Sequence, residues 1–256
     1  MHYDIKLKKG KDLEHLRESC KRLARVLQET KDIIKPGITT KEINDFVYKE
    51  IIDLGDKPAF LNYKPFGASY PYPGSICLSV NHEVVHGIGG DRVLKEGDII
   101  GIDGGILHKG MISDSAITVP VGEISDENKK LLAVTEQALY AGIKAAKCGN
   151  YVNDISCAIE NAVPKKYGIV KILSGHGVGY KVHEEPYVPN FNDGIKGPKL
   201  VPGMVLAIEP MINLGSDDVY LEDDGYTFST EDGKNSAHFE HTILITEGEA
   251  EILTKI

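Results

Sequence analysis

Two segments of this 256-residue chain follow the same pattern, and this repeat constrains the fold more than any other feature of the sequence. Residues 94–103 (LKEGDIIGID) align with residues 200–209 (LVPGMVLAIE). In each segment a Gly precedes an apolar run, and a carboxylate ends that run, as Asp103 and Glu209. The two halves of the chain therefore place an acid at the same point of the same predicted strand.

A second pair of segments extends the repeat. Residues 114–119 (DSAITV) can be laid beside residues 240–245 (EHTILI), which adds Asp114 and Glu240 to the set of matched acids. The repeat predicts two similar halves that pack around a pseudo-two-fold axis, with their carboxylates meeting near it.

The order of predicted elements supports this duplication. Apolar residues at helical spacing precede strand-like runs twice, and Thr39 or Thr40 with Glu42 resembles a helix capping box. We therefore expect an α+β fold in a single domain, residues 1–256, with internal halves of roughly 10–122 and 123–256. The expected elements are helices over 12–35 and 39–54, strands over 75–80, 98–107 and 115–121, helices over 126–147 and 152–167, and strands from 169 onward.

Composition excludes several classes of protein. With 41% hydrophobic and 26% charged residues the chain is of the ordinary soluble type, and its net charge of -9 argues against specific nucleic-acid binding. No secretory signal or membrane-spanning stretch is present in the sequence, which indicates a cytoplasmic protein. The cysteines form no Cys-x-x-Cys pair, so we expect free thiols.

The matched acids are expected to have a cation as their partner. Asp103 and Glu209 each end a run that is apolar enough to be buried, and an isolated buried carboxylate is strongly disfavoured unless it is neutralised or paired. An arginine or lysine is one possible partner. None accompanies the four acids in their own segments, which favours a metal ion.

The ligand types indicate which metal chemistry to expect. Four carboxylates together with His176, in a Gly-His-Gly turn, offer oxygen and nitrogen ligands that suit Mn²⁺, Fe²⁺, Co²⁺ or Zn²⁺. Their negative charge exceeds what one divalent ion needs, whereas two ions about 3.5–4 Å apart can share carboxylates, as in dinuclear hydrolases. A structural Ca²⁺ or Mg²⁺ site is the alternative, which His176 disfavours.

Two further histidines lie near these segments. His86 belongs to residues 81–87 (NHEVVHG) and His183 to residues 174–186 (SGHGVGYKVHEEP). A single histidine is more often a structural hydrogen-bonding group than a catalytic one. The glycines around His176 favour a functional interpretation, because they let the backbone approach a ligand closely.

Taken together, these motifs resemble the type I methionine aminopeptidases, which are pita-bread metallohydrolases, over nearly the whole chain. The family fold is a pseudo-symmetric α+β pita bread with a central antiparallel sheet flanked by helices. The motifs that carry the resemblance are residues 77–87 (CLSVNHEVVHG), 97–103 (GDIIGID), 174–179 (SGHGVG), 183–186 (HEEP), 208–210 (IEP) and 238–242 (HFEHT).

The resemblance implies roles for the site residues. Asp103 would bind one metal ion, Asp114 and Glu240 would bridge both, and His176 with Glu209 would complete the other. His86 would hold the scissile peptide, and His183 would polarise its carbonyl. Glu209 would carry a proton from an activated water to the leaving amine.

The same resemblance implies an apolar pocket for methionine. It places Tyr72, Cys77, Tyr226 and Phe66 in that pocket. Two residues depart from the usual family pattern in a way that predicts a more open pocket rim, namely Val182 and Tyr226. Together with the further departures at Gly89, Ser115 and Ala116, they predict altered affinity and substrate breadth but the same reaction.

The implied function is removal of the initiator methionine from nascent polypeptides with a small second residue, by a cytoplasmic, monomeric enzyme with two divalent ions (Co, Mn, Fe or Zn). The ribosome is then a transient partner. A pita-bread peptidase that cleaves before proline is one alternative, although such enzymes usually carry an extra N-terminal domain. A catalytically silent binding module is the other, and it predicts missing ligands and a basic surface.

Overall fold

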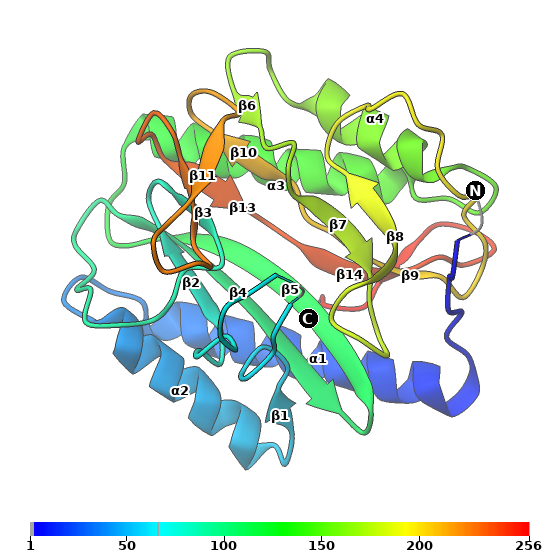
Figure 1. The fold of residues 1–256 in the computed structure, drawn as a ribbon, viewed down its shortest axis with the longest axis horizontal. Coiled ribbons are helices and arrows are strands. Elements are labelled where there is room, and N and C mark those ends of the chain that lie inside the picture. The colour runs from blue at the N-terminus through cyan, green and yellow to red at the C-terminus, as the bar shows by residue number, and fades with distance from the viewer. Residues whose placement is uncertain (1–2, 66, 256) are drawn as a thin grey trace.

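A computed structural model describes residues 3–65 and 67–255, over which the chain forms four helices and fifteen strands. Helices and strands alternate in blocks, so that two helices precede each main group of strands (Figure 1). The helices are α1 (Gly10–Ile33), α2 (Thr40–Asp53), α3 (Asp126–Ala145) and α4 (Val152–Ala162). The predicted α+β order is therefore confirmed.

The first half of the chain is built on a long β-hairpin. Strand β4 (Ile99–His108) pairs antiparallel with β5 (Met111–Pro120) along its whole length, and Lys109 and Gly110 form the tight turn. Strands β1 (Lys57–Pro58) and β2 (Cys77–Val80) pair with the other edge of β4.

The second half is built on shorter strands in the order β15-β14-β9-β7-β8. The arrangement β7–β9–β14 matches β2–β4–β5 of the first half, as the repeat predicts. These strands are β7 (Ser174–Gly177), β8 (Glu184–Pro189), β9 (Val205–Ile208), β14 (His241–Leu244) and β15 (Glu251–Ile252).

Two smaller sheets complete the fold, in the orders β13-β10-β6 and β11-β12-β3. Their strands are β3 (Glu83–Val85), β6 (Gly168–Ile169), β10 (Met211–Asn213), β11 (Val219–Leu221), β12 (Phe228–Thr230) and β13 (Ser236–His238). Within the part of the chain that the structure describes, no helix has the length and apolar character needed to cross a membrane.

The helices cover one side of the strands, and the halves have separate apolar cores. Leu23 of α1 and Val47 of α2 pack with Ile102 of β4 in one buried cluster. The matching cluster of the second half holds α3 and α4 against β9 and β14, with Leu139 and Ile208 among its members. Burial of these apolar faces stabilises each helix pair on its own sheet.

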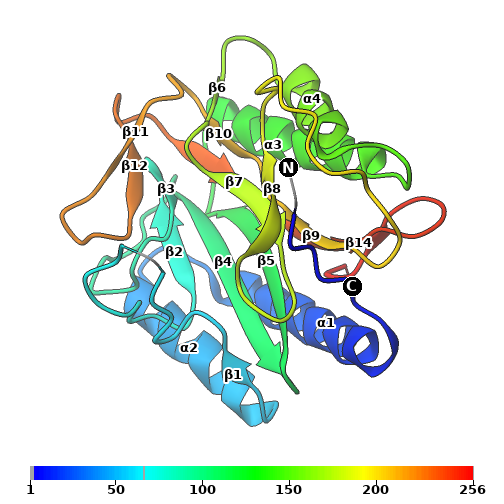
Figure 2. The ribbon, with the colours of Figure 1, turned by 45° about the vertical axis from the view of Figure 1, so that its right-hand side comes forward.

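Hydrogen bonds join the halves where β5 passes the segment before β14. The backbone N–H of Glu240 donates to the carbonyl of Ala116 at 2.8 Å, and the hydroxyl of Ser115 donates to the carbonyl of Glu240 at 2.8 Å. In Figure 2 the long β4–β5 hairpin lies between the α1–α2 side and the strands of the second half. The two sets of acids are thereby brought to one place.

Some predicted boundaries are confirmed and others are wrong. The capping box is present, since Thr39 Oγ1 accepts from Glu42 N while the Glu42 carboxylate accepts from Thr39 N. Helix α4 ends at Ala162, before the predicted Tyr167, because Pro164 disfavours helical conformation in the residue before it.

The strand predicted from residue 115 begins instead at Met111. Polar Ser113 and Asp114 suggest a turn, but both pair within the hairpin, opposite Ile106 and Gly105. Ser113 is fully buried and accepts a hydrogen bond from Ser19 at 2.9 Å. Asp114 thus lies inside a strand, where its side chain has a fixed direction.

Candidate active site

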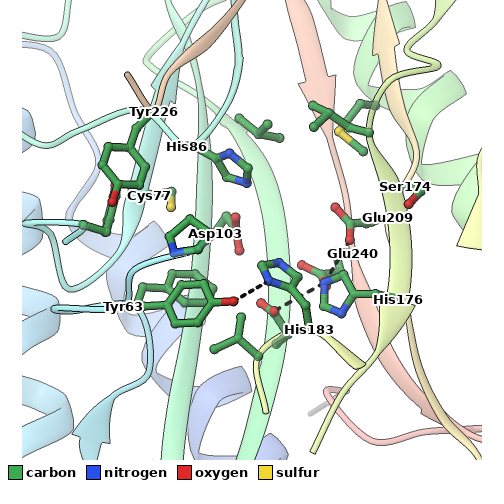
Figure 3. A pocket seen from close by; sticks show the side chains of 18 of the residues that line it. Tyr63, Cys77, His86, Asp103, Ser174, His176, His183, Glu209, Tyr226 and Glu240 are labelled. Atoms are coloured by element: carbon green, nitrogen blue, oxygen red, sulfur yellow. Dashed lines mark hydrogen bonds and ion pairs between the residues drawn. The ribbon is translucent and has the colours of Figure 1, made fainter. Parts of the chain in front are cut away.

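A cavity of about 480 Å³ lies between the two halves and collects most of the predicted site residues (Figure 3). Phe66 lies outside the described residues, so its predicted place in the pocket is untested. The other predicted residues all line the cavity; they are Tyr72, Cys77, His86, Asp103, Asp114, His176, His183, Glu209, Tyr226 and Glu240.

The strands fix where each acid points. Asp103 lies in the middle of β4, opposite Cys77 on β2 and Ala116 on β5. Glu209 and Glu240 lie at the same end of the antiparallel β9–β14 pair, one directly after β9 and the other directly before β14. Acids 100 or more positions apart in the sequence therefore share one cavity.

Three of the five predicted metal ligands form a compact group. Ligand atoms of Asp114, His176 and Glu240 all lie within 4.8 Å of one another, and all three residues are buried. His176 Nε2 lies 3.2 Å from Glu209 Oε1, which connects a fourth predicted ligand to the group. Asp103 lines the same cavity.

His176 is oriented so that one ring nitrogen faces these acids. Its Nδ1 lies 3.0 Å from the carbonyl oxygen of Gly177, which can only accept, so Nδ1 donates. Without a metal ion, an Nε2–H can donate to Glu209, and although burial opposes the shift, this carboxylate raises the pKa of His176. A bound metal ion would instead take the Nε2 lone pair of the neutral ring.

The acids lack the partners that buried carboxylates normally have. Asp103 Oδ1, Asp114 Oδ1 and Glu240 Oε1 are all buried without a hydrogen-bond partner. Across residues 3–65 and 67–255, no lysine or arginine forms an ion pair with these acids. Buried polar atoms are nearly always paired, so these oxygens fit a bound cation.

The pKa shifts of these acids also fit a bound cation. Burial, then the charge of Glu209, raises the pKa of Asp103 to about 7. Burial followed by neighbouring acids raises the pKa of both Asp114 and Glu240 well above the usual range. A divalent cation would reverse these shifts, because it favours the ionised carboxylates.

Glu209 differs from the other acids because imidazoles surround it. Burial pushes its pKa upward, but His176 and His238 outweigh that effect and hold the pKa at about 2. The His238 ring is buried, and its Nε2 lies 3.5 Å from Glu209 Oε2.

His238 had no predicted role, although a signal was available in the sequence. Side chains two positions apart in an extended segment point to the same side, so His238 and Glu240 share a face. A histidine at this spacing from a predicted ligand belongs in the list of candidates.

His86 is held in an unusual backbone conformation. Its φ of 62° is in the left-handed region, which is uncommon for residues other than glycine and occurs often at functional sites. The next residue, Gly87, packs so tightly that an added Cβ would lie 2.3 Å from the carbonyl oxygen of Leu78. Burial lowers the pKa of His86 to about 4, which keeps the ring neutral.

His183 lies at the mouth of the cavity, where its ring is partly open to solvent. Partial desolvation, and then the nearby His176, lower its pKa to about 4. Its Nδ1 lies 3.0 Å from the hydroxyl of Tyr63, the contact drawn as a dashed line in Figure 3. Tyr63 was not predicted as a site residue, because it lies 120 positions away in the sequence.

An apolar wall faces the acids. Tyr72, Cys77, Val182 and Tyr226 belong to one buried cluster, together with Phe60. The Tyr226 ring packs edge-on against Tyr72, with ring centroids 5.2 Å apart. Figure 3 shows Cys77 and Tyr226 across the cavity from Glu209 and Glu240. The cavity therefore combines an apolar recess with a cluster of polar ligands.

Known proteins with this sequence pattern are peptidases. Residues 14–247 match the model of metallopeptidase family M24. The chain is 48% identical to methionine aminopeptidase 1 of Bacillus subtilis, over 97% of this chain and 98% of that protein. It is 44% identical to the methionine aminopeptidase of Aquifex aeolicus, over 98% and 99% of the two chains.

Solved structures agree with the sequence comparison. The crystal structure of methionine aminopeptidase from Rickettsia prowazekii has a TM-score of 0.93 and 38% identity, covering 98% of this chain and all of that one. Prolidase from Pyrococcus furiosus has the same fold, with a TM-score of 0.75 at 22% identity, but this chain covers only 65% of it. The chain has the pita-bread fold and belongs to metallopeptidase family M24, within which it groups with the methionine aminopeptidases.

Proposed function

We propose that this chain is a methionine aminopeptidase, which removes the N-terminal methionine from nascent polypeptides and prefers a small second residue. The observation that carries the proposal is a set of buried, partnerless carboxylate oxygens directly opposite an apolar recess. One side of such a cavity suits cations and the reacting peptide, and the other suits an unbranched apolar side chain.

The proposed metal ligands are those that the sequence predicts. They would hold two divalent ions, of Co, Mn, Fe or Zn, and the ligand set is Asp103, Asp114, His176, Glu209 and Glu240. When bound, such ions supply a water of lowered pKa as the nucleophile and polarise the substrate carbonyl.

Glu209 is suited to move the proton of that water. Without metal, its pKa of about 2 keeps the carboxylate ionised near neutral pH, so its oxygens are free to accept. A carboxylate of such low basicity would pass a proton on rather than keep it. Its position beside His176 and His238 keeps it in the cavity, from where it can deliver the proton to the leaving amine.

His183 is suited to stabilise the oxyanion. A tyrosine hydroxyl donates readily to a neutral imidazole, so Tyr63 places the ring proton of His183 on Nε2. That N–H can then donate to the carbonyl oxygen as negative charge develops on it. His86, also neutral, would hold the scissile peptide from the other side of the cavity.

Tripeptides test the proposed function directly. Metal-free protein is given Mn²⁺, Fe²⁺, Co²⁺ or Zn²⁺ and then Met-Ala-Ser, Met-Leu-Ser or Ala-Pro-Ser. Metal-dependent release of methionine from Met-Ala-Ser, with little product from the other two, is the expected result. Preferential cleavage of Ala-Pro-Ser would point to a proline-directed peptidase, and no cleavage despite bound metal would favour a binding module.

The setting of the enzyme also belongs to the proposal. The chain would act as a single catalytic domain, monomeric and in the cytoplasm, and would contact the ribosome transiently. Light scattering on the purified protein measures whether it is monomeric, and co-sedimentation with ribosomes tests the contact with the ribosome.

A further inference from the structure

A buried ion pair joins the segment before α1 to the loop that carries His183. Lys8 Nζ lies 2.6 Å from Glu184 Oε2, and only 2% and 5% of the two side chains are exposed. Glu184 directly follows His183 in the sequence. Neither member of this pair lines the cavity, so the site described above does not explain it.

Glu184 also accepts hydrogen bonds from the backbone of its own loop, residues 180–184. Its Oε1 accepts the backbone N–H groups of Tyr180, at 2.5 Å, and of Lys181, at 3.0 Å. One carboxylate oxygen therefore fixes the loop internally, and the other fixes it to Lys8.

Lys8 is itself held in place by the body of the protein. Its backbone N–H donates to the carbonyl of Gly203 at 2.8 Å, at the start of the second repeated strand. Its side chain passes Gly179 so closely that an added Cβ there would lie 2.5 Å from Lys8 Cε. Figure 2 shows the N-terminal segment running beside β8, which follows this loop.

The other contacts of the loop are mostly single hydrogen bonds, such as those from Tyr63 to His183 and from the backbone N–H of Asp4 to the Glu185 carboxylate. Between Gly179 and Pro186, Val182 has a buried side chain, whereas Tyr180, Lys181 and His183 are exposed. The hydroxyl of Tyr180 donates to Asp12 of α1 at 2.8 Å, on the surface. A loop with little buried apolar area depends on specific polar contacts for its position.

Stability alone does not account for the pair. Removing two charges from water costs about as much as their attraction returns, so an apolar pair is often as stable. We propose that Lys8 and Glu184 are positioning residues, which hold the 180–184 loop so that His183 keeps its Nε2 directed at the substrate carbonyl. This inference rests on the proposed function, in which His183 contacts that carbonyl.

The principal test uses a variant that leaves no charge unpaired. Lys8→Met combined with Glu184→Gln removes both charges, so the protein is expected to fold, as a melting curve verifies. Small displacements of a catalytic group cost up to about a hundredfold in rate, so we expect kcat for Met-Ala-Ser to fall about tenfold to a hundredfold. KM should change much less.

A mutant cycle separates positioning from general damage. The Lys8→Met/Glu184→Gln change is repeated in a His183→Ala background, where there is no imidazole left to position. A further loss of less than about twofold is expected there, because the two effects act through the same group. An equal loss of kcat in both backgrounds would overturn the inference.

Lys6→Met is the matched control. Lys6 lies two residues away and pairs with Asp4 at 2.5 Å, but 56% and 74% of these side chains are exposed. Removing its charge should leave kcat unchanged. A loss as large as that of the buried pair would mean that the charge of the N-terminal segment matters, rather than the anchor.

Hydrogen exchange supplies a readout that does not depend on activity. Backbone amides of residues 178–185 should exchange faster in the Lys8→Met/Glu184→Gln variant, while those of α1 and α3 keep their protection. Unchanged exchange in the loop would contradict the anchor. If the unmodified protein releases no methionine, the proposed function fails, whereas the exchange comparison still tests the anchor.

Discussion

The two halves of the molecule supply matched acids to one cavity, but they treat the charge of those acids differently. In the first half, Asp103 and Asp114 lie inside ten-residue strands, and burial raises the pKa of both. In the second half, Glu209 follows a four-residue strand, and two imidazoles keep its pKa at about 2.

The difference follows from where each half carries its histidines. The second half contributes His176, His183 and His238, and the first half contributes His86, on the far side of the cavity from Glu209. The hairpin acids therefore depend most on a bound cation for their charge, while Glu209 is ionised in advance. Both halves contribute candidate cation ligands, since Glu240 of the second half also has a raised pKa. The imidazoles set Glu209 apart, so we expect cation binding to depend most on the other acids and proton transfer to depend on Glu209.

The largest expected effect comes from the hairpin. Asp114→Asn should lower kcat/KM for Met-Ala-Ser by at least about a hundredfold, because Asp114 is a proposed metal ligand and bound metal would supply several kcal/mol of transition-state stabilisation. The same variant should bind fewer than the wild-type number of Co²⁺ or Mn²⁺ ions in a calorimetric titration. Wild-type stoichiometry and activity together would contradict the proposed ligand role.

Glu209→Gln should separate the two tasks. We expect kcat to fall about a hundredfold or more, since general acid–base catalysis contributes about 10²–10⁴-fold. Metal content, measured by elemental analysis, should stay closer to wild type than in Asp114→Asn. A fully active Glu209→Gln protein would exclude Glu209 as the proton carrier and remove the distinction between the halves.

Metal removal tests the charge of the hairpin through stability. A carboxyl whose pKa is higher in the folded than in the unfolded state binds more protons when folded, so stability falls as pH rises. With a pKa of about 7 when folded against 3.8 unfolded, Asp103 should cost the metal-stripped wild type about 1 kcal/mol more stability between pH 6.5 and 8 than the metal-stripped Asp103→Asn variant loses, or about 2–4 °C in Tm.

The histidines make a comparison between variants necessary. His86, His183 and His241 have lowered pKa values of about 4, so they make stability rise with pH until the unfolded imidazoles are deprotonated, above about pH 7.5. His176, whose pKa is raised, acts in the same direction as Asp103. The histidines contribute equally in the wild type and in Asp103→Asn, so the difference between the two proteins reports Asp103. Saturating Co²⁺ should raise the Tm of the wild type and remove its extra pH dependence. Identical pH dependence of stability in the metal-stripped wild type and Asp103→Asn would refute the assignment.

The sequence was sufficient for features that are local or repeated. Residues 94–103 and 200–209 predicted equivalent strands that carry Asp103 and Glu209 at matching points, because alignment of a repeat needs no knowledge of long-range contacts. The capping box at Thr39 is local in the same sense. The end of α4 was wrong because the helical periodicity was extended through Pro164.

Contacts between distant segments could not be predicted from the sequence. Lys8 and Glu184 are 176 positions apart, and Tyr63 and His183 are 120 apart, so no spacing rule links them. Tyr63 moreover comes from the irregular segment before β2, where the sequence shows no periodicity. Such residues affect the site through polar contacts between distant segments, and only the folded structure reveals these contacts.

The smallest expected effect concerns one of these residues. Tyr63→Phe removes the hydroxyl that selects the Nε2–H form of His183, while the aromatic ring still packs beside it, with centroids 5.6 Å apart. The loss of a neutral hydrogen bond of about 0.5–1.5 kcal/mol corresponds to a drop in kcat of about twofold to tenfold. Metal content should not change, because the hydroxyl contacts none of the acids.

Tyr48→Phe, on the exposed side of α2, serves as the control and should retain full activity. The ¹⁵N shifts of the His183 ring, assigned with the help of His183→Ala, report the tautomer directly. In the wild type they should show a protonated Nε2, and in Tyr63→Phe a mixture of both forms. A single unchanged tautomer with unchanged kcat would mean that the first half of the chain contributes packing, and no chemical control, to the histidine of the second half.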